Sequence, residues 1–240
     1  MITTHYTIRA AGIRRALRLA VVADLHNYAP RALFDGLATE RPDIVTLPGD
    51  FLEGPGQVEN GLAFLRATAR RFPTLCSVGN HEQKAALPNL AGAVQETGAE
   101  LLDNRSVFRH GIWFGGLSSG WRTADKQTHM AQTPPPDRAF IDDFATREGY
   151  KILLCHHPEY YEPYLQRKSI PLILAGHAHG GQWEIGGQGI YAPGQGLLPR
   201  YTAGLYDERL LVSRGLCNTH RWIPRFGNPR ELVIIDLWPG

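Results

Sequence analysis

The sequence predicts an α/β fold in which short buried strands alternate with helices. Short runs of mainly aliphatic residues stop at Gly, Pro or polar residues, as buried strands do. Stretches with apolar residues at helical spacing lie between the first of these runs. Because strand, helix and strand alternate, ligands are expected beyond the carboxyl ends of the strands.

The predicted elements run through most of the chain. Strands are expected over residues 17–23, 44–47, 75–78, 152–155, 172–175 and 231–237, and helices over residues 30–39, 59–71 and 89–97. Residues 118–137 are expected to form a long loop, and the Gly- and Pro-rich residues 180–200 to form loops and short strands near a site. No stretch has the composition of a linker, so one domain over residues 1–240 is expected.

Composition narrows the classes of function. With 240 residues, the chain can bury a core without disulfides. The formal net charge is +2 and no Lys/Arg-rich run dominates, so no nucleic-acid partner is expected. The chain has three cysteines, an odd number, and none with CxxC spacing, so a disulfide framework is not expected and a reducing compartment fits better. We found no transmembrane segment or leader, so we expect a cytoplasmic protein, with a peripheral position at the inner membrane face left open.

Metal-capable residues follow five of the apolar runs. They are Asp24, His26, Asp50, Asn80, His156, His177 and His179. Carboxylate and imidazole together suit Zn, Mn or Fe better than Ca or Mg alone. A single Asp-x-His or Gly-Asp motif is common by chance. Five such motifs that each directly follow a predicted strand are not expected by chance. The sequence therefore predicts a cage for two divalent metal ions, with one carboxylate shared between them.

These motifs resemble a known family. Asp24-Leu25-His26, Gly49-Asp50, Gly79-Asn80-His81-Glu82, His156-His157-Pro158 and Gly176-His177-Ala178-His179 are similar to the five motifs of calcineurin-like metallophosphoesterases. The segments GHAHGGQ (176–182), YTAGLY (201–206) and SRGL (213–216) resemble a bacterial branch of single-domain phosphodiesterases. Relatives in that branch often carry a membrane anchor or leader, and some cleave the pyrophosphate of UDP-2,3-diacylglucosamine. This sequence shows neither, so we do not expect membrane anchoring.

The resemblance implies a fold and a role for each site residue. The fold would be a four-layer α/β/β/α sandwich of two mixed sheets flanked by helices, with the metals at the strand carboxyl ends. Asp24, His26 and His179 would hold the first metal, Asn80, His156 and His177 the second, and Asp50 both. His81 would contact the phosphate and either stabilise or protonate the leaving oxygen. Glu82, where the family most often has Asp, would orient His81.

Some assignments stay open at this point. The family pattern His-x-Pro favours His156 as the ligand, with His157 as its neighbour. Arginine matches phosphate geometry best, so Arg105, Arg214 and Arg225 are candidates for substrate binding. Trp121 and Trp183 would either stack on substrate or simply pack. His220 lies near Arg221 and Arg225 in a loop-like segment, whereas His5, His110 and His129 are expected at the surface.

The expected function is binuclear-metal-dependent phosphoester hydrolysis, and more narrowly phosphodiester hydrolysis by in-line attack of a metal-bridging hydroxide on phosphorus. The expected substrate is a small phosphoester or a lipid-linked phosphate. One alternative is a non-catalytic scaffold that binds protein partners, since some members of the superfamily have lost metal ligands; here every expected ligand is present. A nuclease is disfavoured by the near-neutral charge.

Overall fold

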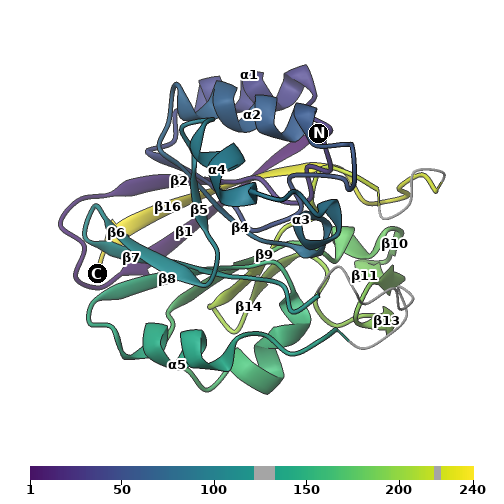
Figure 1. Ribbon diagram of the computed structural model, residues 1–240. Helices are drawn as coiled ribbons and strands as arrows, with labels where there is room; N and C mark the ends of the chain where they lie inside the picture. The colour runs from purple at the N-terminus through teal and green to yellow at the C-terminus, as the bar shows by residue number, and fades with distance from the viewer. Residues whose placement is uncertain (122–132, 219–222) are drawn as a thin grey trace.

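Two six-stranded mixed sheets pack face to face between outer layers of helices (Figure 1). The structure is a computed structural model and describes residues 1–121, 133–218 and 223–240. The predicted α/β/β/α arrangement is confirmed.

The first sheet has the strand order β1-β16-β2-β3-β4-β5. Its strands are β1 (Ile2–Ala10), β2 (Leu17–Val21), β3 (Ile44–Leu47), β4 (Thr74–Ser77), β5 (Glu100–Leu102) and β16 (Glu231–Pro239). Strands β2 to β5 are parallel, whereas β16 runs antiparallel to β2. The carboxyl ends of β2, β3 and β4 therefore meet at one edge of this sheet.

The second sheet has the order β14-β15-β9-β8-β7-β6. Its strands are β6 (Arg105–Arg109), β7 (Ile112–Leu117), β8 (Tyr150–Cys155), β9 (Leu172–Ala175), β14 (Gly204–Tyr206) and β15 (Leu210–Val212). Strands β7, β8, β9 and β15 are parallel to one another. Two short hairpins lie outside both sheets: β10 (Glu184–Ile185) with β11 (Gln188–Gly189), and β12 (Tyr191–Ala192) with β13 (Gly196–Leu197).

The central strands are mainly apolar because both of their faces are covered. In β2, Leu19 and Val21 belong to the core between the two sheets. Ala20, which alternates with them, packs under the helices on the outer face. Successive side chains of a strand point to opposite faces, so a strand buried on both sides reads as an unbroken apolar run.

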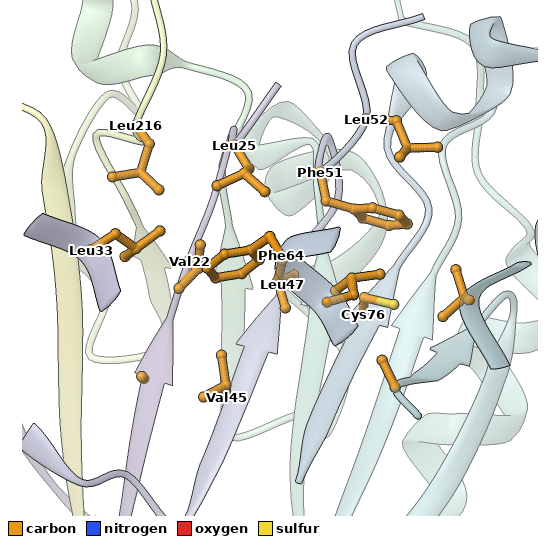
Figure 2. Close-up of a cluster of buried hydrophobic side chains, with 14 of the residues drawn as sticks. Val22, Leu25, Leu33, Val45, Leu47, Phe51, Leu52, Phe64, Cys76 and Leu216 are labelled. Atoms are coloured by element: carbon orange, nitrogen blue, oxygen red, sulfur yellow. The ribbon is translucent and has the colours of Figure 1, made fainter. Parts of the chain in front are cut away.

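Helices cover the outer faces of both sheets. They are α1 (Arg31–Glu40), α2 (Glu59–Ala69) and α4 (Leu90–Gln95) on the first sheet, α5 (Arg138–Thr146), η1 (Pro158–Tyr160) and η2 (Tyr161–Leu165) on the second, and α3 (Asn80–Ala85) and η3 (His179–Gly181) after strand ends. Figure 2 shows Leu33 of α1 and Phe64 of α2 packed over Val22 and Val45 of the first sheet. Within the described residues, no helix is long and apolar enough to cross a bilayer.

Each predicted strand and helix has a counterpart in the structure, although the helix expected over residues 89–97 is shorter. Residues 180–200 form the two short hairpins, as expected. Residues 122–132 of the predicted loop lie outside the described part of the chain. The sequence reading missed β1, the β5-to-β7 segment, β14, β15, and helices α3 and α5.

Candidate metal centre

The predicted metal ligands converge where the strands of the two sheets end. Asp24 and His26 follow β2, Asp50 follows β3 and His156 follows β8. Among the described residues, four groups of three have ligand atoms within 4.8 Å of one another, and two of these groups consist of predicted ligands alone: Asp24, His26 and His179 in one, and Asp50, His156 and His177 in the other. The division matches the one that the resemblance implies, with Asn80 as the remaining member of the predicted set.

Unusual backbone conformations turn these side chains inward. Five of the predicted ligands have a left-handed φ, namely Asp24 (50°), His26 (45°), Asp50 (52°), His177 (65°) and His179 (47°). This region is uncommon for residues other than glycine, and such strained residues concentrate at functional sites. The chain thus bends sharply after each strand, and the bend directs a polar side chain across the sheet edge.

Asp50 lies between the two groups. Its Oδ2 atom is 3.1 Å from Nε2 of His156 and 3.6 Å from Nε2 of His26, and its Oδ1 accepts a hydrogen bond from the backbone N–H of His81 at 2.8 Å. Burial opposes ionisation of Asp50, but the neighbouring His156 and His81 hold its pKa well below the ordinary value. Asp50 is therefore an ionised carboxylate that faces ligands of both groups.

Hydrogen bonds to backbone carbonyls fix the imidazole tautomers. Nδ1 of His156 donates to the carbonyl of Pro48 at 3.0 Å, and Nδ1 of His179 donates to the carbonyl of Cys217 at 2.9 Å. Each hydrogen bond places a proton on Nδ1 and turns Nε2, the atom that binds a metal ion, toward the cage. The Nε2 atoms of the two rings face Asp50 and Asp24, respectively.

Two buried polar atoms of the cage have no hydrogen-bond partner among the described residues: Nε2 of His26 and Oδ1 of Asn80. Buried polar atoms are normally satisfied, so an orphaned pair at one site indicates a missing ligand. Both atoms carry lone pairs, and the surrounding donors are imidazole nitrogens and carboxylate oxygens. The residues present therefore fit divalent metal ions of the Mn, Fe or Zn type.

Glu82 has a different role from the expected one. Its Oε2 accepts from the backbone N–H of Asp50 at 2.7 Å and of Gly79 at 2.8 Å, and its Oε1 accepts from Leu52 at 2.8 Å. The prediction that Glu82 orients the His81 ring is wrong, because its carboxylate accepts hydrogen bonds from the loop after β3 and from Gly79 after β4. Burial, followed by repulsion from Asp50, raises the pKa of Glu82 to about 7.

His81 is oriented by another residue, Glu53. Nδ1 of His81 donates to the backbone carbonyl of Glu53, which leaves Nε2 on the cage side, 4.0 Å from Oδ2 of Asp50. Burial lowers the pKa of His81 to about 4, although Asp50 partly opposes this shift. The ring is therefore neutral near pH 7, and an anionic group brought close to it would favour its protonated form.

The hydrogen-bond partners of His156 and His157 show which of the two adjacent histidines belongs to the cage. His156 joins the cage, with Nε2 also 3.1 Å from Nδ1 of His177. Both ring nitrogens of His157 are engaged elsewhere: Nε2 lies 2.7 Å from Oγ of Ser119, and Nδ1 lies 3.1 Å from Oε1 of Glu159. The structure thus brings His156, rather than His157, to Asp50.

The three candidate arginines lie in different surroundings. Arg225 donates to the carbonyls of Cys217 and Arg214, and burial lowers its pKa to about 10. Arg214 pairs with Glu184. Arg105 begins β6 and lines a recess beside α4 that contains no cage residue. The first two guanidinium groups hold the loops next to the cage, and substrate contact by any of the three stays a prediction.

Of the remaining aromatic and histidine candidates, those that the structure describes make contacts outside the cage. Trp183 donates its indole N–H to the carbonyl of Pro224 at 2.8 Å, and the backbone N–H of Trp121 donates to Ser119. His5 pairs with Glu40, and His110 lies against Arg15. His129, His220 and Arg221 lie outside the described residues.

Sequence reasoning missed two carboxylates next to the cage. Oε2 of Glu53 lies 3.0 Å from Nδ1 of His26. Glu159 accepts from Thr133 at 2.6 Å and lies 3.7 Å from Nε2 of His177. Both carboxylates lie close to a predicted ligand in the sequence: Glu53 stands three residues after Asp50, and Glu159 directly follows the His-His-Pro motif.

Comparison with known proteins gives matches along most of the chain. The family model described as calcineurin-like phosphoesterase matches residues 17–181. The chain is 27% identical to the uncharacterized metallophosphoesterase YkuE of Bacillus subtilis, over 82% of this chain and 68% of YkuE. It is 25% identical to the uncharacterized metallophosphoesterase Cj0846 of Campylobacter jejuni, over 96% of this chain but only 61% of Cj0846. It is also 25% identical to the uncharacterized protein YpbG of B. subtilis, over 92% of this chain and 81% of YpbG.

Proposed function

The chain belongs to the calcineurin-like phosphoesterase family, which makes it a metal-dependent phosphoester hydrolase, and from this premise we propose that it hydrolyses phosphodiesters at a two-metal centre. The first ion would be held by Asp24, His26 and His179, the second by Asn80, His156 and His177, and both by Asp50. The preferred ions are Mn, Fe or Zn, because the donors are imidazole nitrogens and carboxylate or amide oxygens.

One observation carries this proposal. The ionised carboxylate of Asp50 lies between two clusters of metal-capable side chains, within 3.6 Å of imidazole nitrogens from each. Two ions sharing one carboxylate would satisfy the orphaned Nε2 of His26 and Oδ1 of Asn80. A structural role alone does not account for so many buried, strained polar residues at one sheet edge.

When bound, two divalent ions supply an activated water nucleophile and neutralise charge on the phosphoryl oxygens. The chain's own residues position the metal ligands and transfer a proton to the leaving oxygen. Glu82 holds the backbone of Asp50, and the Pro48 and Cys217 carbonyls fix the rings of His156 and His179. His81, anchored through Nδ1, presents Nε2 to the site. With an anionic phosphoester beside it, the ring takes up a proton and passes it to the leaving oxygen.

The same proposal includes an expected class of substrate and an expected cellular location. Once His81 has taken up a proton at Nε2, it can protonate a departing alkoxide. This suits alcohols that are poor leaving groups and favours alkyl phosphodiesters over activated esters. Substrate contact by Arg105, Arg214 or Arg225 is part of the same proposal. Cys76, Cys155 and Cys217 are free thiols, which suits work in the reducing cytoplasm.

The test is metal analysis combined with a panel of phosphoesters. We expect two equivalents of Mn, Fe or Zn per chain, and faster hydrolysis of bis-p-nitrophenyl phosphate than of p-nitrophenyl phosphate. A sample with both metals bound that cleaves no member of the panel would point to the non-catalytic scaffold instead.

A further inference from the structure

Glu159 lies beside the second group of metal ligands, outside the seven residues of the cage. Its Oε1 atom is 3.7 Å from Nε2 of His177, within ion-pair distance, and the side chain of Glu159 is only 13% exposed. Its other oxygen, Oε2, is buried and has no hydrogen-bond partner among the described residues. The carboxylate therefore faces the His177 ring with an acceptor atom still available.

The ring of His177 is turned the opposite way from the rings of His156 and His179. Its Nδ1 atom lies 3.1 Å from Nε2 of His156 and points into the cage, whereas the other two rings present Nε2. Nε2 of His177 faces Glu159 instead. Because an ionised carboxylate can only accept a hydrogen bond, it favours the tautomer with a proton on Nε2 and a lone pair on Nδ1. In that tautomer the nitrogen that faces the cage can bind an ion.

Hydrogen bonds hold the carboxylate of Glu159 in place. The hydroxyl of Thr133 donates to Oε1 at 2.6 Å, and Nδ1 of His157 donates to the same oxygen at 3.1 Å. Nε2 of His157 in turn accepts from the hydroxyl of Ser119 at 2.7 Å. Ligand atoms of His157, Glu159 and His177 also lie within 4.8 Å of one another. Since both nitrogens of His157 are already engaged, this trio is a hydrogen-bonded support rather than a third metal site.

A glycine leaves room for the carboxylate. Gly194, in the turn between β12 and β13, has φ +73°, and a Cβ atom there would overlap Oε1 of Glu159 and lie 2.7 Å from the hydroxyl oxygen of Thr133. Gly196 has a similar φ of +81°, but a Cβ atom there would have no atom within 4 Å. The hairpin thus packs closely against the Glu159 carboxylate at one position and leaves open space two residues later.

We propose that Glu159 is a positioning residue for the second metal ion and acts through the Nε2–H group of His177. This inference rests on the proposed two-metal centre, since it assigns Glu159 to one of the two ions. A carboxylate behind a metal-ligating histidine fixes the ring and raises its basicity as a ligand. Glu53 stands in the corresponding place behind His26 of the first group. Each ion then has a carboxylate of its own outside the cage.

The experiment is equilibrium dialysis of the full chain, stripped of metal with EDTA, against increasing free Mn, followed by metal analysis. In Glu159→Ala we expect the first Mn equivalent to bind as in the wild type and the second to need about 10–100-fold more free Mn. Glu159→Gln keeps an acceptor oxygen and should recover most of this loss. The matched control is Glu162→Ala, which removes a nearby carboxylate that pairs with Arg200. This control should bind both equivalents as the wild type does.

The double variant Glu53→Ala, Glu159→Ala shows which ion each carboxylate supports. If they support different ions, both Mn equivalents weaken in the double variant. If one equivalent keeps its wild-type affinity, the two carboxylates act on the same ion and the assignment of Glu159 to the second ion is wrong. A loss of packing alone would weaken both equivalents already in the single variant Glu159→Ala, and this result would also contradict the assignment.

Gly194→Ala tests the same contact with Glu159 left in place. The added Cβ atom displaces the carboxylate, so the second Mn equivalent should weaken, whereas Gly196→Ala carries the same left-handed backbone cost and should bind both ions normally. Wild-type affinity for the second equivalent in either Glu159→Ala or Gly194→Ala would overturn the role of Glu159. A wild-type chain that binds fewer than two equivalents would instead overturn the two-metal centre of the proposed function, and the assignment of Glu159 with it.

Discussion

The carboxylate of Glu53 lies 3.0 Å from Nδ1 of His26, on the side of the ring away from the cage. Burial opposes ionisation of Glu53, but its hydrogen bond with His26 lowers the pKa of the carboxyl group. The pair therefore holds a proton on Nδ1 and leaves Nε2 of His26 available as a lone-pair donor. A carboxylate behind a histidine is a common way to orient a metal ligand.

Removal of this carboxylate should weaken metal binding. For Glu53→Ala we expect the apparent affinity for Mn to fall by about 10–100-fold, the usual cost of losing such an outer partner. Glu53→Gln is the matched control, because its amide oxygen can still accept from Nδ1. Activity titrated against added Mn measures the affinity. Since His81 bonds to the backbone of Glu53, turnover at saturating metal should change little; equal Mn affinity in wild type and Glu53→Ala would contradict the assignment.

His81 should affect chemistry without affecting metal content. In His81→Ala we expect turnover on an alkyl phosphodiester, whose alkoxide leaving group needs a proton, to fall by about 100-fold or more, the usual contribution of a positioned proton donor. Metal analysis of the same sample should give the wild-type stoichiometry. Asp50→Asn is the contrasting variant, since it should lower both metal content and rate. Full activity in metal-loaded His81→Ala would exclude His81 from the reaction.

The predictable part of the fold was its doubly buried centre. Strands such as β3, with the sequence IVTL, are covered on both faces, so they stand out as apolar runs. The edge strand β1 has the sequence ITTHYTIRA, with exposed positions alternating with half-buried ones, so no run marks it. Its partner is β16, more than 220 residues away, and only the three-dimensional pairing makes it a strand.

The convergence of the candidate metal ligands was predictable for a related reason. These residues directly follow the apolar runs, and strand ends of parallel sheets share an edge. Glu53 could not be assigned in the same way, because its contact with His26 depends on the left-handed turn at His26 (φ 45°) and Asn27 (φ 61°). The expected role of Glu82 was wrong because its carboxylate accepts from three backbone N–H groups, two in the loop after β3 and one at Gly79, whose positions depend on the path of both loops.

Glu82 should contribute to stability more than to catalysis. In Glu82→Gln, an amide NH₂ replaces one of the oxygens that accept from the Asp50, Gly79 and Leu52 backbones. A buried donor then faces another donor, so we expect the free energy of unfolding to fall by about 1–3 kcal/mol. Urea unfolding of the metal-free protein measures this. The control is Lys84→Gln, a half-buried neighbour that takes no part in these three hydrogen bonds. A loss of equal size in that variant would speak against the network.

Gly215 should be intolerant of any side chain. It has φ +67°, and a Cβ atom there would lie 2.4 Å from Oδ2 of Asp24. Gly56 has a similar φ of +71°, but a Cβ atom there would have no atom within 4 Å. Both Ala variants carry the left-handed backbone cost of about 1–2 kcal/mol. Only Gly215→Ala should also displace Asp24, and so weaken Mn binding in the titration used for Glu53; matching affinities in the two variants would refute the contact.

Chelation should destabilise the whole fold. Asp24 and Asp50 are 0% and 1% exposed, and the cage brings these carboxylates together with buried histidines from both sheets. Metal that binds only the folded state adds stability by mass action, about 4 kcal/mol at a free concentration one thousand times the dissociation constant. Thermal unfolding with and without EDTA should therefore show a lower midpoint for the metal-free protein. In Asp50→Asn, which should bind metal poorly, EDTA should move the midpoint much less. If both proteins shift equally, the stabilising metal lies somewhere other than the cage.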